Sequence, residues 1–169
     1  MIIRVSDLQG EGLHIADPAA LASPFADSSW RLTRLDLHVE RDAADVVVHG
    51  ELGATVPQTC GRCLESFPVD VRAAVDSRFV PRPATGENVE LGEDDLETDF
   101  YTNDQLDLAA LVETETTLAL PMKPLCREDC RGLCPVCGAN RNTVPCTCVP
   151  PPRDPRLAAL AELAARFNN

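Results

Sequence analysis

The stretch that decides the fold is Thr55-Val-Pro-Gln-Thr-Cys60-Gly-Arg-Cys63-Leu-Glu-Ser-Phe-Pro-Val69-Asp-Val71-Arg-Ala-Ala-Val75. Its second half alternates apolar and polar residues, as a strand with one buried face does. Its first half leads into two cysteines that flank a Gly-Arg pair, which favours a tight turn. The stretch therefore predicts a hairpin with two thiols at its tip.

Further strands are predicted on the N-terminal side of this hairpin. Residues 35–40 alternate strictly, residues 46–52 form a second candidate strand after a polar turn, and residues 2–5 are a short apolar start. Hydrophobic residues make up 44% of the chain but aromatic ones only 4%, so the core must be aliphatic. We expect an α+β fold, mainly an antiparallel β-sheet or a partly open barrel, with attached helices and a C-terminal zinc-ribbon-like segment.

Two helices are predicted. Asp107 can cap one that runs from Leu108 to about Ala119 and ends before Pro121. Its neighbouring turns carry Leu108, Leu111, Val112, Glu115 and Leu118. The pair Asp154-Pro155 begins the other. The expected organisation is a β-rich core domain over 1–120 with an acidic loop at 84–99 and a helix at 107–120. A Cys/Pro-rich zinc-binding segment over 121–152 and a C-terminal helix over 153–169 follow.

Eight cysteines form four close pairs: Cys60/Cys63, Cys126/Cys130, Cys134/Cys137 and Cys146/Cys148. Each pair can offer two sulfurs from one turn to a tetrahedral metal ion. The chain start lacks the features of a signal peptide, and no apolar run is long enough for a membrane span, so we expect a cytoplasmic protein with no membrane partner. Cytoplasmic thiols stay reduced, which favours one or two zinc ions over disulfides.

Two assignments of ligands to metal ions are open. In the first, a ribbon site binds one zinc ion through Cys134, Cys137, Cys146 and Cys148. A hairpin site then binds a second ion through Cys60, Cys63, Cys126 and Cys130, which explains the isolated upstream pair. The competing assignment has a single site built from four of the six C-terminal cysteines. We favour two sites.

The charge is unevenly distributed within a net charge of −12. Residues 84–120 hold eleven carboxylates and no Lys or Arg, which suits either a solvated loop or contact with a basic protein. Residues 121–156 hold six basic residues against three acidic ones. Each zinc ion with four thiolates carries a formal −2, so two sites would turn that positive balance slightly negative. Direct RNA contact there is a second candidate.

The sequence does not favour an enzyme. His38-Val39-Glu40 with a later cysteine pair is superficially similar to the zinc deaminase motif, but both polar side chains lie on the polar face of a predicted strand. Cys60 and Cys63 lie between two strands rather than at a helix start, unlike a thioredoxin-type redox pair. His14, His38 and His49 are scattered in the sequence and are expected to be ordinary surface or core residues.

Several motifs together resemble one family. They are Cys60-Gly-Arg-Cys63-Leu-Glu-Ser-Phe, then Val112-Glu-Thr-Glu115 before Leu118-Ala-Leu-Pro121, and Cys130-Arg-Gly-Leu-Cys134-Pro-Val-Cys137-Gly-Ala-Asn140. The chain resembles the YceD family of large ribosomal RNA subunit accumulation proteins from the early strands to about Cys148. Arg141 stands where the family usually has Leu, which affects no ligand.

The resemblance implies a bacterial or plastid protein needed for normal 23S ribosomal RNA levels, with a largely β fold. We therefore expect a zinc-stabilised, non-enzymatic factor in assembly of the large ribosomal subunit. Its expected partner is a ribosomal protein or the pre-ribosomal large subunit. A zinc-dependent RNA-binding module acting directly on ribosomal RNA, and a cytosolic redox or zinc-sensing protein, remain alternatives.

Overall fold

The computed structural model describes residues 1–8, 10, 12–82, 98–149, 156 and 160, and two compact units divide the chain. We call them the β unit (Met1–Gln58 and Ser66–Pro124) and the cysteine unit (Thr59–Glu65 and the chain from Leu125 on). The acidic residues 84–97 and nearly all of the predicted C-terminal helix at 153–169 lie outside the described residues.

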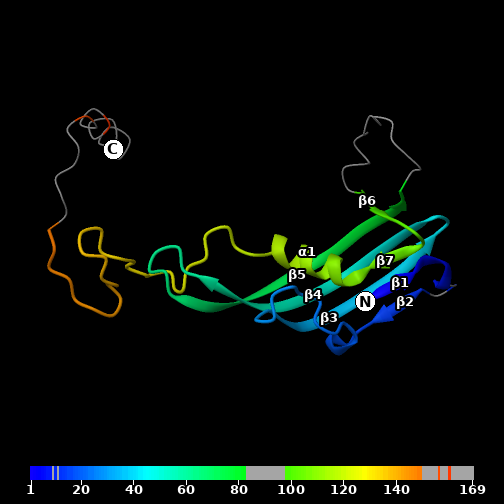
Figure 1. Ribbon diagram of the computed structural model, residues 1–169, viewed down its shortest axis with the longest axis horizontal. Coiled ribbons are helices and arrows are strands. Elements are labelled where there is room, and N and C mark those ends of the chain that lie inside the picture. Colours follow the sequence, from blue (N-terminus) through cyan, green and yellow to red (C-terminus); the bar gives the residue numbers. More distant parts are fainter. Residues whose placement is uncertain (9, 11, 83–97, 150–155, 157–159, 161–169) are drawn as a thin grey trace. The chain divides into compact units, whose positions relative to one another are not determined.

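The β unit is built on a five-stranded sheet of order β2-β3-β4-β5-β6 (Figure 1). The strands are β2 (Leu13–Ile15), β3 (Arg31–Asp42), β4 (Asp45–Thr59), β5 (Ser66–Pro81) and β6 (Thr98–Tyr101). A second, two-stranded sheet pairs β1 (Ile2–Arg4) with β7 (Gln105–Asp107). Among the described strands β2 and β6 are edges, so the larger sheet is open rather than a barrel.

The long strands follow the predicted alternation. In β3 the side chains of Leu35, Leu37 and Val39 are buried, and in β5 the buried residues Val71, Val75 and Phe79 recur on one face. The two predicted segments at 46–52 and 55–59 form one continuous strand, β4. The prediction of a mostly β fold is therefore confirmed, and its core is aliphatic as expected.

One strand pairing differs from the antiparallel expectation. β6 pairs with β5 in parallel, with Arg78 opposite Thr98 and Pro81 opposite Tyr101. The last two residues of the predicted acidic loop, Thr98 and Asp99, belong to this strand. Neither Asp99 nor Phe100 is buried, so this strand does not alternate between buried and exposed residues. An alternating sequence pattern could therefore not have predicted it. The pairings β1–β7, β2–β3 and β3–β4 are antiparallel.

The predicted helix is α1 (Leu108–Leu118), and it packs against β5 and β1. The carboxylate of Asp107 accepts a hydrogen bond from the amide of Ala109, as an N-cap should. Leu108, Leu111 and Val112 are buried as expected, but Leu118 is exposed. Thr116 is buried in its place, and its hydroxyl donates to the carbonyl of Val112 at 2.7 Å, which satisfies the polar group. Two short 3-10 helices, Val5–Asp7 and Pro18–Ala20, complete the unit.

Candidate metal centres

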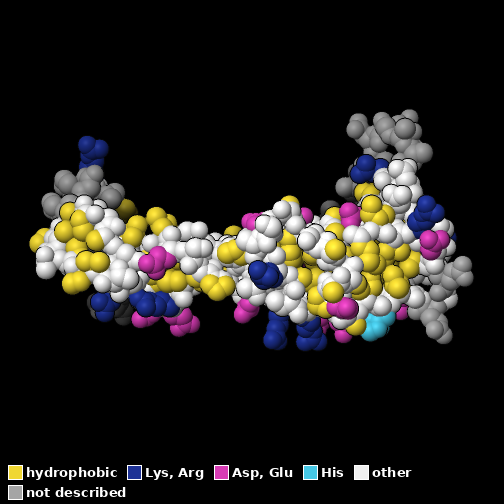
Figure 2. Space-filling model, turned by 60° about the horizontal axis from the view of Figure 1, so that its bottom comes forward, with side chains coloured by type: hydrophobic (Ala, Val, Ile, Leu, Met, Phe, Trp, Pro, Cys, Tyr) yellow, Lys and Arg dark blue, Asp and Glu magenta, His cyan; other side chains and the backbone are white. Residues whose placement is uncertain are grey.

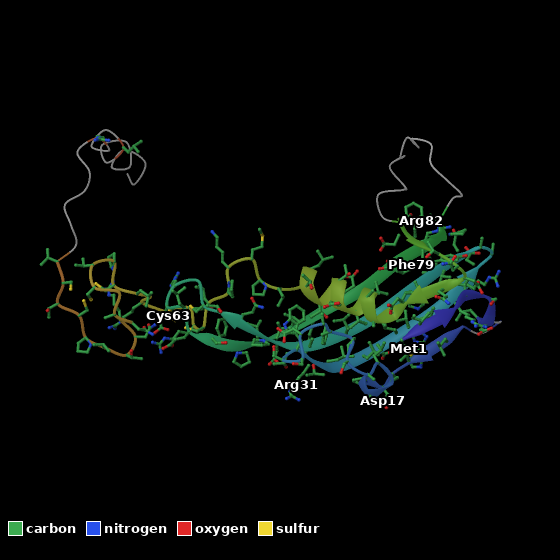
Figure 3. The ribbon with its side chains drawn as sticks, viewed as in Figure 1. Met1, Asp17, Arg31, Cys63, Phe79 and Arg82 are labelled. Carbon is green, nitrogen blue, oxygen red and sulfur yellow. The ribbon has the colours of Figure 1, made fainter. Side chains whose placement is uncertain are left out.

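The first cysteine pair lies in the residues that join β4 and β5, at the position labelled Cys63 in Figure 3. Three hydrogen bonds shape this turn. The amide of Arg62 donates to the Cys60 sulfur at 3.5 Å, the amide of Leu64 donates to the Cys60 carbonyl, and the amide of Cys60 donates to the Glu65 carbonyl. The turn therefore presents both sulfurs on one side while its amides stabilise negative charge on Cys60.

The third cysteine pair repeats this turn at every position. The amide of Val136 donates to the Cys134 sulfur at 3.4 Å, that of Gly138 to the Cys134 carbonyl, and that of Cys134 to the Ala139 carbonyl. The residue after the second cysteine has a left-handed backbone in both turns, with φ of 61° at Leu64 and 73° at Gly138. Two segments some seventy residues apart thus form the same thiol-presenting turn.

The hairpin site brings four thiols together. The sulfur of Cys60 lies 3.8 Å from that of Cys130, and the sulfur of Cys63 lies 3.6 Å from that of Cys126. All four sulfurs lie within 4.8 Å of one another. A tetrahedral zinc ion with bonds of about 2.3 Å separates its sulfurs by roughly 3.8 Å. The separations fit that geometry, and they are far too long for disulfide bonds of about 2.05 Å.

The ribbon site has the same donor set in a more exposed place. The sulfur of Cys146 lies 3.6 Å from that of Cys137 and 3.4 Å from that of Cys134, and Cys148 completes the group within 4.8 Å. Cys134 is buried, Cys146 is half-buried, and Cys137 and Cys148 are exposed. In the hairpin site, by contrast, Cys60, Cys63 and Cys130 are all buried.

The two sites are joined by asparagine side chains from the loop between Cys137 and Cys146. The amide group of Asn142 donates to the Cys130 sulfur at 3.3 Å, while its oxygen accepts from the amide of Arg131 at 2.8 Å. Asn140 donates to Glu65, the residue that follows the first turn, at 2.8 Å. A loop of the ribbon site thus supplies hydrogen bonds around the hairpin site.

Backbone contacts also bring the two segments of the cysteine unit together. The carbonyl of Arg62 accepts from the amide of Leu133, and the Arg62 guanidinium donates to the carbonyls of Glu128 and Cys130. Gly132 has a φ of 67°, and an added Cβ there would lie 2.8 Å from the Arg62 carbonyl. Glycine is therefore required where the chain passes this carbonyl.

The electrostatics of the thiols favour a cation. Hydrogen bonds from the amides of Cys126, Cys63 and Arg62 lower the pKa of Cys60 to about 6, and those from Cys137 and Val136 lower the pKa of Cys134 to about 6. The neighbouring thiols cannot then all ionise together. Burial and the adjacent thiols raise the pKa of Cys126 to about 12, and the thiols of Cys146 and Cys137 do the same to Cys148. A divalent cation would remove this conflict in each site.

The structure therefore places the eight predicted ligands in two groups of four, and the donor set fits zinc: soft thiolates, four per site, at tetrahedral separations. Sequence reasoning missed Asn140, Asn142 and Glu65. The signal available for them was weak, because an asparagine between cysteines is equally typical of a surface turn.

The three histidines, which are scattered in the sequence, are brought side by side on the sheet of the β unit by strand pairing. None of the three is buried.

The protein therefore belongs to the class that combines a β-sheet domain with a cysteine-rich module, and its thiols are arranged as metal ligands are. More particularly, the chain belongs to the YceD family: the model of "Large ribosomal RNA subunit accumulation protein YceD" matches residues 48–164, a range that contains all eight cysteines. The resemblance inferred from the motifs is confirmed.

The chain is also similar to uncharacterized mycobacterial proteins. It is 37% identical over 137 residues to proteins of Mycobacterium tuberculosis and Mycobacterium bovis, covering 78% of this chain and 62% of each relative. A Mycobacterium leprae protein is 32% identical over 106 residues, covering 63% of this chain and 48% of the relative. The chain thus spans less than two thirds of the length of these relatives. No solved structure matches. Within the described residues, no helix is long and apolar enough to cross a membrane.

Proposed function

We propose that the chain is a non-enzymatic factor that supports accumulation of 23S ribosomal RNA during assembly of the large ribosomal subunit, and that two zinc ions stabilise it. One observation carries the proposal: the match to a family described by ribosomal RNA accumulation spans both thiol groups and the sheet strands from β4 to β6, beginning at Val48. In this proposal the zinc ions stabilise the conformation of a surface that binds the partner.

The sites suit a structural role better than a catalytic one. Each would have four sulfur ligands, and a zinc ion with four protein ligands leaves no position open for water or substrate. Zinc would be held by Cys60, Cys63, Cys126 and Cys130 in one site and by Cys134, Cys137, Cys146 and Cys148 in the other. It would supply the ordering energy that a segment rich in proline and poor in large apolar residues lacks.

A basic ribosomal protein, alone or in the pre-ribosomal large subunit, is the proposed partner. The net charge of −12 and the eleven carboxylates of residues 84–120 favour such a partner, because opposite charge steers association. Glu113 is a poor candidate for this contact, since its carboxylate accepts a hydrogen bond from the amide of Ala26 at 3.0 Å. Glu115 and the carboxylates of residues 87–99 remain candidates.

Direct contact with ribosomal RNA is the second candidate. It is supported by Arg127, Arg131 and Arg141, which are exposed on the cysteine unit and can reach phosphate oxygens. The formal charge of the zinc–thiolate groups weighs against it, because it lowers the positive potential there.

One experiment separates these candidates. Tagged, zinc-loaded chain is used to capture partners from a bacterial extract at moderate ionic strength, with and without ribonuclease. Large-subunit proteins retained after ribonuclease treatment support the protein partner, and neutralising residues 87–99 together with Glu115 should then reduce capture. Capture that is lost with ribonuclease, and reduced by changing the three arginines to Gln, supports RNA contact. Capture of neither class overturns the proposal.

A redox or zinc-sensing protein is the remaining alternative, and the exposed thiols Cys137 and Cys148 are the feature that suggests it. Thiol titration of the native chain with and without chelator tests it. Thiols that react only after chelation support structural sites. Rapid reaction of the two exposed thiols in the zinc-loaded chain supports sensing.

A further inference from the structure

All three histidines of the chain lie in one row across the sheet of the β unit. His14 of β2 is directly opposite His38 of β3, and His38 is directly opposite His49 of β4. The rings of His14 and His38 stack with centroids 4.0 Å apart and planes 8° apart, and those of His38 and His49 are 5.3 Å apart. Figure 2 shows histidine at the surface with acidic side chains nearby.

A carboxylate lies beside two of these rings. Asp36 precedes His38 by two residues in β3, so its side chain is on the same face of the sheet. One of its oxygens, Oδ1, lies 2.8 Å from Nε2 of His14 and 3.9 Å from Nε2 of His38. The three donor groups lie within 4.8 Å of one another. His14, Asp36 and His38 are each close to half exposed, so an ion can reach them from solvent.

These donors match the chemistry of a transition-metal site. Two imidazoles and a carboxylate at about 2.0–2.2 Å from a zinc ion have donor atoms separated by roughly 3.3 Å. The two separations from Asp36 lie on either side of that value. The nearly parallel rings must tilt to aim both nitrogens at one ion, a rotation that half-exposed side chains can make. The hydrogen bond from His14 lowers the pKa of Asp36, which keeps this carboxylate in its ligand form.

The surrounding charges permit a cation. Arg34 is a positive side chain of β3 close enough to act on Asp36, and its guanidinium pairs with Glu51 at 3.3 Å. Glu51 is directly opposite Asp36 in the neighbouring strand, so a second carboxylate lies beside the histidine row. The face is therefore acidic around the imidazoles.

We propose that His14, Asp36 and His38 form a surface binding site for one divalent transition-metal ion, separate from both cysteine sites. Imidazole favours zinc, nickel, copper and cobalt over magnesium and calcium, so the site belongs to the former group. Three protein ligands leave at least one position for water or for a side chain of a partner. Metal binding at Nε2 of His14 requires the free lone pair of that nitrogen, so the hydrogen bond between His14 and Asp36 would be given up when the ion binds.

The site is tested on the full chain with its cysteine sites filled by zinc. Nickel ion is titrated into ¹⁵N-labelled protein, and paramagnetic changes are followed at each backbone amide. The proposal expects changes centred on residues 13–15 and 36–38. Changes confined to the amides around the cysteines, or absent up to millimolar nickel, overturn it.

Variants assign the ligands. His14→Gln, Asp36→Asn and His38→Gln should each weaken nickel binding at least about tenfold, as loss of a ligand does. His49→Gln is the matched control: it removes an exposed imidazole from the same row, yet His49 is outside the three-donor group, so binding should change less than about twofold. Equal losses in His49→Gln and His38→Gln would show a diffuse histidine surface and overturn the assignment.

Discussion

The hairpin site and the ribbon site use the same cysteine turn, but they differ in how far apart their ligands lie in the sequence and in how exposed those ligands are. In the hairpin site the sulfurs of Cys63 and Cys126 belong to residues 63 positions apart, and three of its four cysteines are buried. In the ribbon site the corresponding pair, Cys137 and Cys146, is nine positions apart, and two cysteines are exposed. The same turn can therefore join distant segments or shape a local loop. Loss of a cysteine ligand should unfold different parts of the chain in the two sites.

Zinc removal should have the largest effect, because it abolishes both sites. Structural zinc sites of this kind contribute about 10–16 kcal/mol, which is folding energy for a segment without its own core. We expect about two zinc ions per chain by elemental analysis. After chelation, amides of the cysteine unit should lose protection from hydrogen exchange, while those of β3 to β5, with their buried aliphatic residues, should keep it.

A chain purified without zinc, or with coloured iron in its place, would contradict this expectation. Equal loss of protection in both units would show that the sheet also depends on the metal.

Breaking one site at a time should separate them. Cys60→Ser removes a buried ligand that connects the turn after β4 to the chain beyond residue 125, so protection should fall in both segments of the cysteine unit. Cys137→Ser removes an exposed ligand, so the loss should be largest over residues 134–148, with a smaller effect at the hairpin site that Asn142 of this loop supports. Each variant should retain about one zinc ion per chain. If Cys137→Ser exposes residues 59–65 as strongly as Cys60→Ser does, the two sites do not fold separately.

The features that could be predicted from the sequence are those with a local pattern. The alternation of residues 35–40, the cap at Asp107 and the spacing of the cysteines each reflect contacts within a few residues. β2, β6 and β7 have three or four residues each, too few to show a period, and their positions depend on partners far along the chain. Leu118 shares the helical period of Leu108 and Leu111, yet it is exposed at the end of α1.

The histidine row was missed for the same reason. Once Asp42 pairs with Asp45 across the turn, the register between β3 and β4 sets His38 opposite His49, so half of the row follows from the hairpin. His14 joins it only because β2 pairs with β3, and β2 has no pattern of its own. Asn142 is similar, since its contact with Cys130 depends on how the loop of the ribbon site packs.

Asn142 provides the next test, because it joins the two sites. Its side chain lowers the pKa of Cys130 by donating to the sulfur, which favours the thiolate that binds metal. Asn142→Ala should weaken zinc at the hairpin site by about 10–100-fold, the usual effect of losing a partner of a metal ligand. Competition with a chromophoric chelator measures this. Thr143→Ala is the matched control, since that hydroxyl contacts the carbonyl of Asn140 and no sulfur, and it should leave the affinity unchanged.

The smallest expected effect concerns the residue that ends each turn. Gly138 has a φ of 73°, and an added Cβ there meets nothing within 4 Å, so Gly138→Ala should cost only the left-handed backbone preference, about 1–2 kcal/mol. Leu64 already adopts a φ of 61° with an exposed side chain. Leu64→Gly should relieve about 1–2 kcal/mol of strain but lose roughly 0.5–1 kcal/mol to the backbone entropy of the unfolded chain, for a net stabilisation between about zero and 1.5 kcal/mol.

Zinc-competition curves on the two variants measure both effects, because each turn is ordered when its site fills. We expect weaker zinc affinity at the ribbon site in Gly138→Ala and equal or higher zinc affinity at the hairpin site in Leu64→Gly. This outcome would show that glycine is favoured at the left-handed position of both turns. Weaker zinc in Leu64→Gly would mean that the leucine side chain itself supports the turn, and the equivalence would then hold for the hydrogen bonds but not for the position that ends them.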